Sequence, residues 1–209
     1  PNIDQQEGAE ACHYFLQQRL KPSVPFGVIT KIILLVLQSN VMNFMGRYFH
    51  QIKGTAMGTP MAVNFANLFM AKFEQELLFQ YEKESGRKPS SWLRFIDDIF
   101  FIWTGDKRSL NDFMSFCNHF HEHNVYSSKI KFTFNTSTKS VNFLDTTVTL
   151  NPDGTLSTNL YAKPTAAHNY LHHLSYHVPY VIKSIPISQF TRIRRICSTI
   201  GDLGVKIYL

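Results

Sequence analysis

The stretch Trp92-Leu93-Arg94-Phe95-Ile96-Asp97-Asp98-Ile99-Phe100-Phe101-Ile102-Trp103 places two adjacent aspartates between two apolar runs rich in aromatic and β-branched residues. This pattern predicts a β-hairpin whose two-residue tip carries both acids. Its flanks are apolar enough to be buried, so the hairpin would hold both carboxylates rigidly at the edge of a core. Adjacent anions repel and are costly to desolvate, and a hard divalent cation such as Mg²⁺ removes that cost. From these residues alone, a metal-binding catalytic tip and a plain turn that favours Asp both remain open.

The composition and the cysteine spacing limit the class of protein. The chain has 209 residues, enough for one large domain or one and a half small ones, and its 44% of hydrophobic residues supports a real core. No apolar run approaches the length of a membrane span and no signal-peptide pattern opens the chain, so we expect no membrane partner. Cys12, Cys117 and Cys197 are far apart and form no CxxC pair. This spacing argues against a zinc finger or a disulfide framework and favours a reducing compartment.

Positive charge is in excess and is unevenly distributed. The formal net charge is +6 and the isoelectric point is about 9.2. From Tyr161 onward Asp202 is the one acid, and it stands against the basic residues Lys163, Lys183, Arg192, Arg194, Arg195 and Lys206. A basic tail that faces a polyanion is one interpretation, and a solvated basic face with no partner is the other. Charge alone does not decide between them.

A glycine-rich segment, Gly54-Thr55-Ala56-Met57-Gly58-Thr59-Pro60, precedes a segment with helical periodicity. Two glycines close together let a backbone approach another molecule without interference from Cβ atoms, and a proline fits the first turn of a helix. The predicted helix places one apolar face toward the core, formed by Phe65, Leu68, Phe69, Phe73 and Leu77. Such a loop could bind a phosphate or a sugar, or it could be only a tight connection. It does not match the Walker pattern.

The remaining segments predict helices and strands in alternation. Helices are expected over Gln5–Leu20, over Thr30–Gln38 as a buried segment, over Leu110–His121, and after Pro186. Short strands at 43–45 and 48–50, a half-buried strand at 129–134 and a hairpin over 141–161 complete the pattern. This interleaving predicts an α+β fold in which helices cover one side of an antiparallel sheet. The histidines at 168, 172, 173 and 177 are compatible with zinc, but no acid or cysteine lies nearby in sequence to complete a site.

The order of these pieces is that of the palm of reverse transcriptases, and several blocks of sequence resemble one branch of them, the Penelope-like retroelements. The blocks are GTAMGTPMA at 54–62, ANLFM at 66–70, RFIDDIF at 94–100, VNFLD at 141–145, YAKPT at 161–165 and RIRRICS at 192–198. The resemblance covers nearly the whole chain. It implies a retrotransposon enzyme, an RNA-directed DNA polymerase (a nucleotidyltransferase), with an α+β palm over residues 1–162. Residues 163–209 would then form the palm–thumb connection and the start of the thumb.

The resemblance also implies roles for individual residues. Asp97 and Asp98 match the metal-binding pair, which would hold two Mg²⁺ ions, with Mn²⁺ as a possible substitute. Lys131 is the candidate for the lysine that protonates leaving pyrophosphate, with Lys129 as its rival. Arg94 is interpreted as a surface arginine, with shielding of the two acids or contact with primer phosphate as the alternatives. Template or nucleotide contacts fall on Met57, Gly58 and Asn67, the primer grip on Phe143, Leu144 and Asp145, and nucleic-acid backbone contacts on Lys163, Arg192, Arg194 and Arg195. The implied partners are an RNA template, a DNA primer and deoxynucleoside triphosphates, and the implied location is nuclear, or cytoplasmic before import.

Two departures from the family pattern matter. Val63 stands where the family usually has proline, and this difference does not affect any residue that takes part in the reaction. The third carboxylate of such polymerases comes from a strand that would precede Asn2, and Asp4 is a poor substitute for it. Because the chain begins at Pro1, we expect it to be a fragment that does not polymerise alone. The competing interpretation is a non-catalytic nucleic-acid-binding remnant of a decayed or domesticated retroelement.

Overall fold

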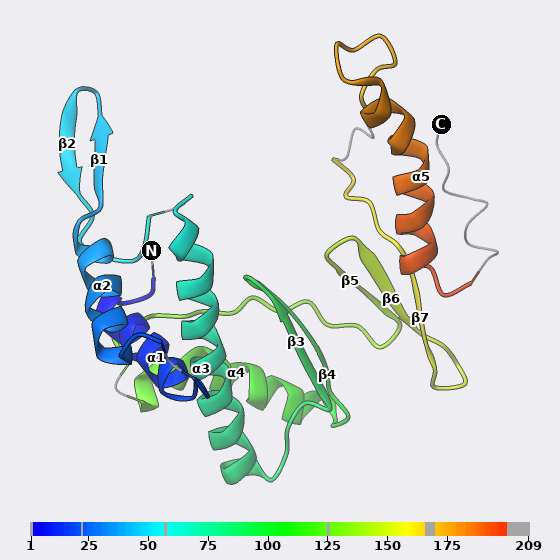
Figure 1. Ribbon diagram of the computed structural model, residues 1–209. Helices are drawn as coiled ribbons and strands as arrows, with labels where there is room; N and C mark the ends of the chain where they lie inside the picture. The colour runs from blue at the N-terminus through cyan, green and yellow to red at the C-terminus, as the bar shows by residue number, and fades with distance from the viewer. Residues whose placement is uncertain (1, 22, 57, 125, 166–169, 200–209) are drawn as a thin grey trace. The chain divides into compact units, whose positions relative to one another are not determined.

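Five helices and seven strands make up the described part of the computed structural model, which covers residues 2–21, 23–56, 58–124, 126–165 and 170–199 (Figure 1). The chain divides into unit 1, Pro1–Phe134, and unit 2, Asn135–Leu209. Unit 1 contains α1 (Gln5–Gln17), α2 (Phe26–Gln38), β1 (Val41–Phe44), β2 (Arg47–His50), α3 (Pro60–Ser85), β3 (Ser91–Phe95), β4 (Asp98–Ile102) and α4 (Lys107–His123). Unit 2 contains β5 (Ser140–Phe143), β6 (Thr146–Leu150), β7 (Leu156–Leu160) and α5 (Pro179–Ile196). The predicted α+β class is confirmed.

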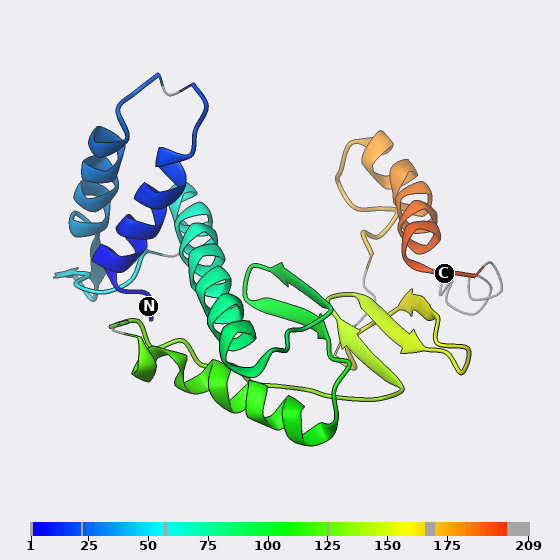
Figure 2. The same cartoon turned by 90° about the horizontal axis from the view of Figure 1, so that it is seen from below.

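Helix α3 is the central element of unit 1. Pro60 occupies its first turn, and the helix ends at Gly86, whose left-handed backbone (φ +69°) few other residues adopt without strain. The predicted apolar face is buried at Phe65, Phe69, Phe73 and Leu77. Figure 2 shows α1 and α4 beside α3, and the core between the three helices adds Ala11, Phe113, Cys117 and Phe120.

The β3–β4 hairpin packs one face onto this helical core. Trp92 stacks on its cross-strand partner Phe101 with ring centroids 5.5 Å apart, and Phe101 meets Phe113 of α4 edge-on at 5.6 Å. The opposite face is open, because Leu93 and Phe95 are exposed. The prediction that both apolar flanks are buried is therefore wrong for one face of the hairpin.

The antiparallel strands do not form the single sheet that the sequence predicts. Among the described residues they form three separate sheets, β1–β2, β3–β4 and β5–β6–β7. The expected strand at 129–134 is an extended segment with alternating burial but no strand ladder. Asn118 of α4 takes the place of a neighbouring strand, because its side chain accepts from the Phe132 amide at 2.7 Å and donates to the Phe132 carbonyl at 3.1 Å.

Three further elements differ from expectation. Helix α2 begins earlier than predicted and fully buries Leu37 alone, with Ile33 packed against the same cluster and Ile32, Leu35 and Val36 exposed. No helix of the described residues is long and apolar enough to cross a membrane. The segment 141–150 is interrupted by a turn at Leu144-Asp145 and forms two strands. Helix α5 begins at Pro179, so Pro186 lies inside it rather than before it.

Gly8→Ala is expected to destabilise unit 1, although alanine favours helices over glycine by about 1 kcal/mol. A Cβ atom at Gly8 of α1 would lie 2.1 Å from the ring of Phe65, which is fully buried among other core side chains. Overpacking of this kind costs about 1–3 kcal/mol, so urea denaturation should show a lower free energy of unfolding. Gly27→Ala in α2 is the matched control, because no atom lies within 4 Å of its added Cβ. Equal stability of the two variants would contradict the prediction.

Candidate functional site

The turn between β3 and β4 lies one residue earlier than the sequence predicts. Phe95 pairs with Asp98, so the turn consists of Ile96 and Asp97, and Asp98 is the first residue of β4. The prediction that both aspartates occupy the tip is therefore wrong by one position. The register follows from the stacked aromatic pair on the packed face, which fixes which residues of the two strands face each other.

This turn holds a β-branched residue in a conformation that normally requires glycine. Ile96 has φ +56°, and such strain costs about 1–3 kcal/mol unless neighbouring contacts hold the backbone. Asp97 and Asp98 beside it are both exposed. No hydrogen bond or ion pair from the described residues engages either carboxylate. The turn thus presents two unpaired carboxylates on a restrained backbone.

Arg94 supplies the contacts that restrain the turn. Its guanidinium donates to the Ile96 carbonyl at 3.2 Å, to the Asn67 side-chain oxygen at 2.8 Å and to the Asn67 carbonyl at 3.1 Å. It also pairs with Glu74 at 2.8 Å. The side chain of Arg94 is 12% exposed, so the interpretation of a surface arginine is wrong. Arg94 ties the aspartate turn to the helix that follows the glycine-rich loop.

Glu74 is the buried partner that sequence reasoning missed. Its side chain is 11% exposed. Burial raises the pKa of its carboxyl, and the hydrogen bond and charge of Arg94 oppose that shift without cancelling it. Asn67 and Glu74 are seven residues apart on α3 and therefore lie on the same side of the helix. That spacing, together with the position of Arg94 on the packed face of β3 beside Trp92, is the signal that could have found the contact.

The glycine-rich loop leads directly into α3, as expected. Gly58 has φ +84°, and apart from its chain neighbours no atom of the described residues lies within 4 Å of where its Cβ would be. Met57 lies outside the described residues. Asn67 is two turns into the helix, with its side chain held by Arg94 rather than free. The structure therefore connects Asn67 to the Asp97 turn through one guanidinium.

Other predicted site residues lie away from any such network. Lys131 and its rival Lys129 are exposed on the extended segment after α4. In unit 2, Lys163, Arg194 and Arg195 are exposed as well. The five side chains are therefore accessible to a polyanion, but their exposure does not identify a partner.

The predicted primer-grip residues form a second hairpin turn in unit 2. Phe143 pairs with Thr146, and Leu144 has φ +54°, as Ile96 has in the first hairpin. Here the aspartate is paired: Asp145 accepts from Arg192 Nη2 at 2.5 Å and Nε at 3.0 Å. This contact lowers the pKa of Asp145 and attaches the turn to α5. Arg192, which the sequence predicts to contact the nucleic-acid backbone, is therefore also part of an ion pair within unit 2.

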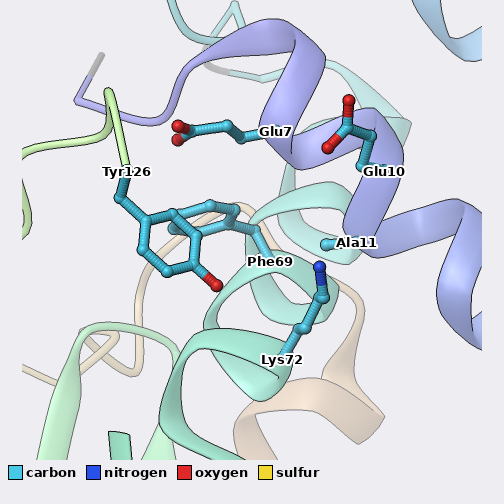
Figure 3. Close-up of a pocket in the computed structure, with 6 residues that line it drawn as sticks. All are labelled: Glu7, Glu10, Ala11, Phe69, Lys72 and Tyr126. Carbon is cyan, nitrogen blue, oxygen red and sulfur yellow. The ribbon is translucent and has the colours of Figure 1, made fainter. Parts of the chain in front are cut away.

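A small cavity of about 120 Å³ lies between α1 and α3 (Figure 3). Its lining residues are Glu7, Glu10, Ala11, Phe69, Lys72 and Tyr126. The Tyr126 hydroxyl donates to Glu76, and burial raises the pKa of that hydroxyl. Glu7 accepts from the Ser128 amide at 3.0 Å. The cavity contains none of the predicted site residues, and its polar side chains join α1, α3 and the segment after α4.

The aspartate turn is not a closed metal site among the described residues. Within the described ranges, no group of three or more His, Cys, Asp or Glu side chains could hold a metal ion by itself, and this includes His172, His173 and His177. His168 lies outside the described residues. Mg²⁺ is commonly bound by one or two carboxylates, several waters and substrate phosphates rather than by a closed protein cage. Two exposed, unpaired carboxylates meet that requirement.

Comparisons with known proteins bear on the carboxyl-terminal part of the chain. Residues 169–203 match the family described as the animal helix-turn-helix domain. No curated protein and no solved structure matches the chain. The matched segment lies in unit 2, contains α5, and does not include the aspartate turn.

Proposed function

We propose that this chain is part of an RNA-directed DNA polymerase that adds deoxynucleotides to a primer by two-metal phosphoryl transfer. The observation that carries the proposal is the Asp97 turn, where two exposed carboxylates sit beside a strained Ile96. Arg94 fixes that turn to α3, the helix that follows the Gly58 loop. These features agree with the sequence blocks that resemble reverse transcriptases of Penelope-like elements.

In this proposal Asp97 and Asp98 hold Mg²⁺, which would stabilise the charge that develops on the phosphoryl oxygens. The chain's own contribution is positioning. Arg94 donates to the Ile96 carbonyl and to Asn67, and so ties the turn beside Asp97 to α3. Positioning and electrostatics supply most of the catalysis in reactions of this kind. Lys131, exposed after α4, is the proposed proton donor to the leaving group.

The match to a helix-turn-helix family favours a second candidate, nucleic-acid binding without catalysis. Helix-turn-helix motifs commonly place a helix against DNA. The matched segment contains α5, where Arg194 and Arg195 are exposed. This candidate needs the basic residues of unit 2 and does not need the carboxylates at the Asp97 turn.

Mn²⁺ broadening of amide signals in nuclear magnetic resonance spectra distinguishes the two candidates. With a deoxynucleoside triphosphate present, we expect residues 95–99 to broaden at Mn²⁺ concentrations about tenfold or more below those that affect other exposed turns, since adjacent carboxylates favour a hard cation. Asp97→Asn should remove the selective broadening. Asp153→Asn is the matched control, because Asp153 is also an exposed turn aspartate. Uniform weak broadening of all acidic turns would contradict the polymerase proposal and leave the binding candidate.

A further inference from the structure

The β1–β2 hairpin exposes aromatic side chains without any cover from the described residues. All eight residues of its two strands are exposed. Figure 1 shows the hairpin projecting beyond the end of α2. Phe44 is 61% exposed and Phe49 is 47% exposed, whereas the aromatic side chains of α3 and α4 such as Phe69, Phe73 and Phe113 line the core. Exposed apolar patches of this kind commonly mark a binding surface.

One face of this hairpin combines aromatic and cationic side chains. The register pairs Met42 with Phe49 and Phe44 with Arg47, and cross-strand partners point to the same side of a sheet. Phe44, Phe49 and Arg47 therefore share one face, which we call the aromatic platform together with Met42. Lys53, also exposed, follows β2 closely in sequence.

The charge around the platform indicates a polyanionic partner. No Asp or Glu occurs from Ala11 to Phe73, and Arg47 of β2 and Lys53 just after it are the basic residues of this stretch that belong to the hairpin or follow it closely. A protein partner that covers an apolar face needs no such excess of one sign. A nucleic acid does, because its phosphates gain from each nearby cation.

We propose that the aromatic platform binds single-stranded nucleic acid, with bases stacked on Phe44 and Phe49 and phosphates near Arg47 and Lys53. Unpaired bases offer flat faces to aromatic rings, and each stack is worth about 1–3 kcal/mol. A duplex hides those faces, so the platform selects single strands. Its assignment to an RNA template, as distinct from any single strand, rests on the proposed function.

The test is fluorescence anisotropy of the full chain with a labelled single-stranded RNA of about 12 nucleotides, which lies within the usual site sizes. Phe44→Ala/Phe49→Ala should weaken binding at least about tenfold and leave the salt dependence unchanged, because stacking and phosphate contacts are separate contributions. Arg47→Gln should lower the slope of log affinity against log salt by about 0.7. Phe79→Ala is the matched control, since Phe79 is 70% exposed on α3 and outside the platform.

The outcomes separate this inference from the proposed function. If wild type binds RNA and the double variant binds equally well, the platform assignment is wrong and the polymerase proposal is unaffected. Sedimentation velocity tests a further outcome. If the wild type is a dimer, the double variant is a monomer and both bind RNA equally well, then a second copy of the chain covers the face and the inference is also wrong. If the wild-type protein binds single strands but shows no selective Mn²⁺ broadening at the Asp97 turn, the polymerase proposal alone is contradicted.

Discussion

Asp97→Asn is expected to reduce primer-directed nucleotide addition by about a thousandfold or more, with little change in binding of primer and template. The substitution preserves the size of the side chain and removes the negative charge that would hold the cation. Loss of one preorganised electrostatic group costs about 10²–10³ in rate, and loss of a metal ligand should reach at least the upper end of that range. Binding should survive because the basic residues and the aromatic platform are unchanged.

The assay is single-nucleotide primer extension on an RNA template by the natural full-length protein. Anisotropy with the same primer and template measures binding separately. Asp153→Asn, at the exposed turn between β6 and β7, should retain wild-type extension. If Asp97→Asn extends primers at a rate close to that of wild type, the assignment of Asp97 as a metal ligand is wrong.

Periodicity predicted the elements that pack against one another within a short range of sequence. The apolar faces of α3 and α4 are spaced by three and four residues, and burial follows that spacing at Phe69, Phe73, Phe113 and Phe120. The failure at α2 has a physical cause. Its residues are apolar on nearly every side, so composition predicts burial, but burial also needs a neighbour, and the described residues leave most of α2 exposed.

The candidate site could be predicted only in part, because its support comes from distant residues. The sequence indicated Asp97 and Asp98 as a pair, whereas Arg94 was interpreted as a surface residue. Its link to α3 can be predicted only once the packed face of β3 is known, because the spacing of Asn67 and Glu74 has no partner to match until then. The two hairpin turns show the same limit. Phe95-Ile96-Asp97-Asp98 and Phe143-Leu144-Asp145-Thr146 have the same local pattern and the same left-handed first turn residue. Asp145 is paired with Arg192, whereas no described residue pairs with Asp97.

That difference has a consequence for chemistry. A carboxylate already paired with an arginine has much of its charge compensated, and a metal ion would have to displace the guanidinium. A metal ion that binds an exposed carboxylate without a partner does not have to displace a guanidinium. The same turn geometry therefore gives a structural anchor in unit 2 and a candidate ligand in unit 1, and the partner supplied by a distant element decides which.

Arg94→Met is expected to lower the free energy of unfolding of unit 1 by about 3–5 kcal/mol, the usual cost of removing one partner from a buried ion pair. The variant leaves Glu74 buried without its cation and deprives the Ile96 carbonyl and Asn67 of a donor. Urea denaturation followed by tryptophan fluorescence reports the loss, since Trp92 lies in the core that the hairpin shares with α4. Arg87→Met is the control: Arg87 pairs with Asp106 at 3.7 Å on the surface, and its loss should cost about 1 kcal/mol at most.

The pH dependence of the Arg94→Met deficit identifies Glu74 as its cause. Burial already raises the pKa of Glu74 above the ordinary value of 4.5, and removal of Arg94 should raise it further. The pKa of Glu74 is higher in the folded state than in the unfolded chain, so the unfolded chain releases this proton first as the pH rises. The free energy of unfolding therefore falls as the pH rises through the interval above 4.5. The deficit should therefore be smallest below that pH and grow toward neutrality. Glu74→Gln in the Arg94→Met background should recover about 1–3 kcal/mol at neutral pH, because a buried amide costs less than a buried charge. A deficit that is independent of pH and unchanged by Glu74→Gln would show that Arg94 stabilises the turn through the Asn67 and Ile96 contacts alone.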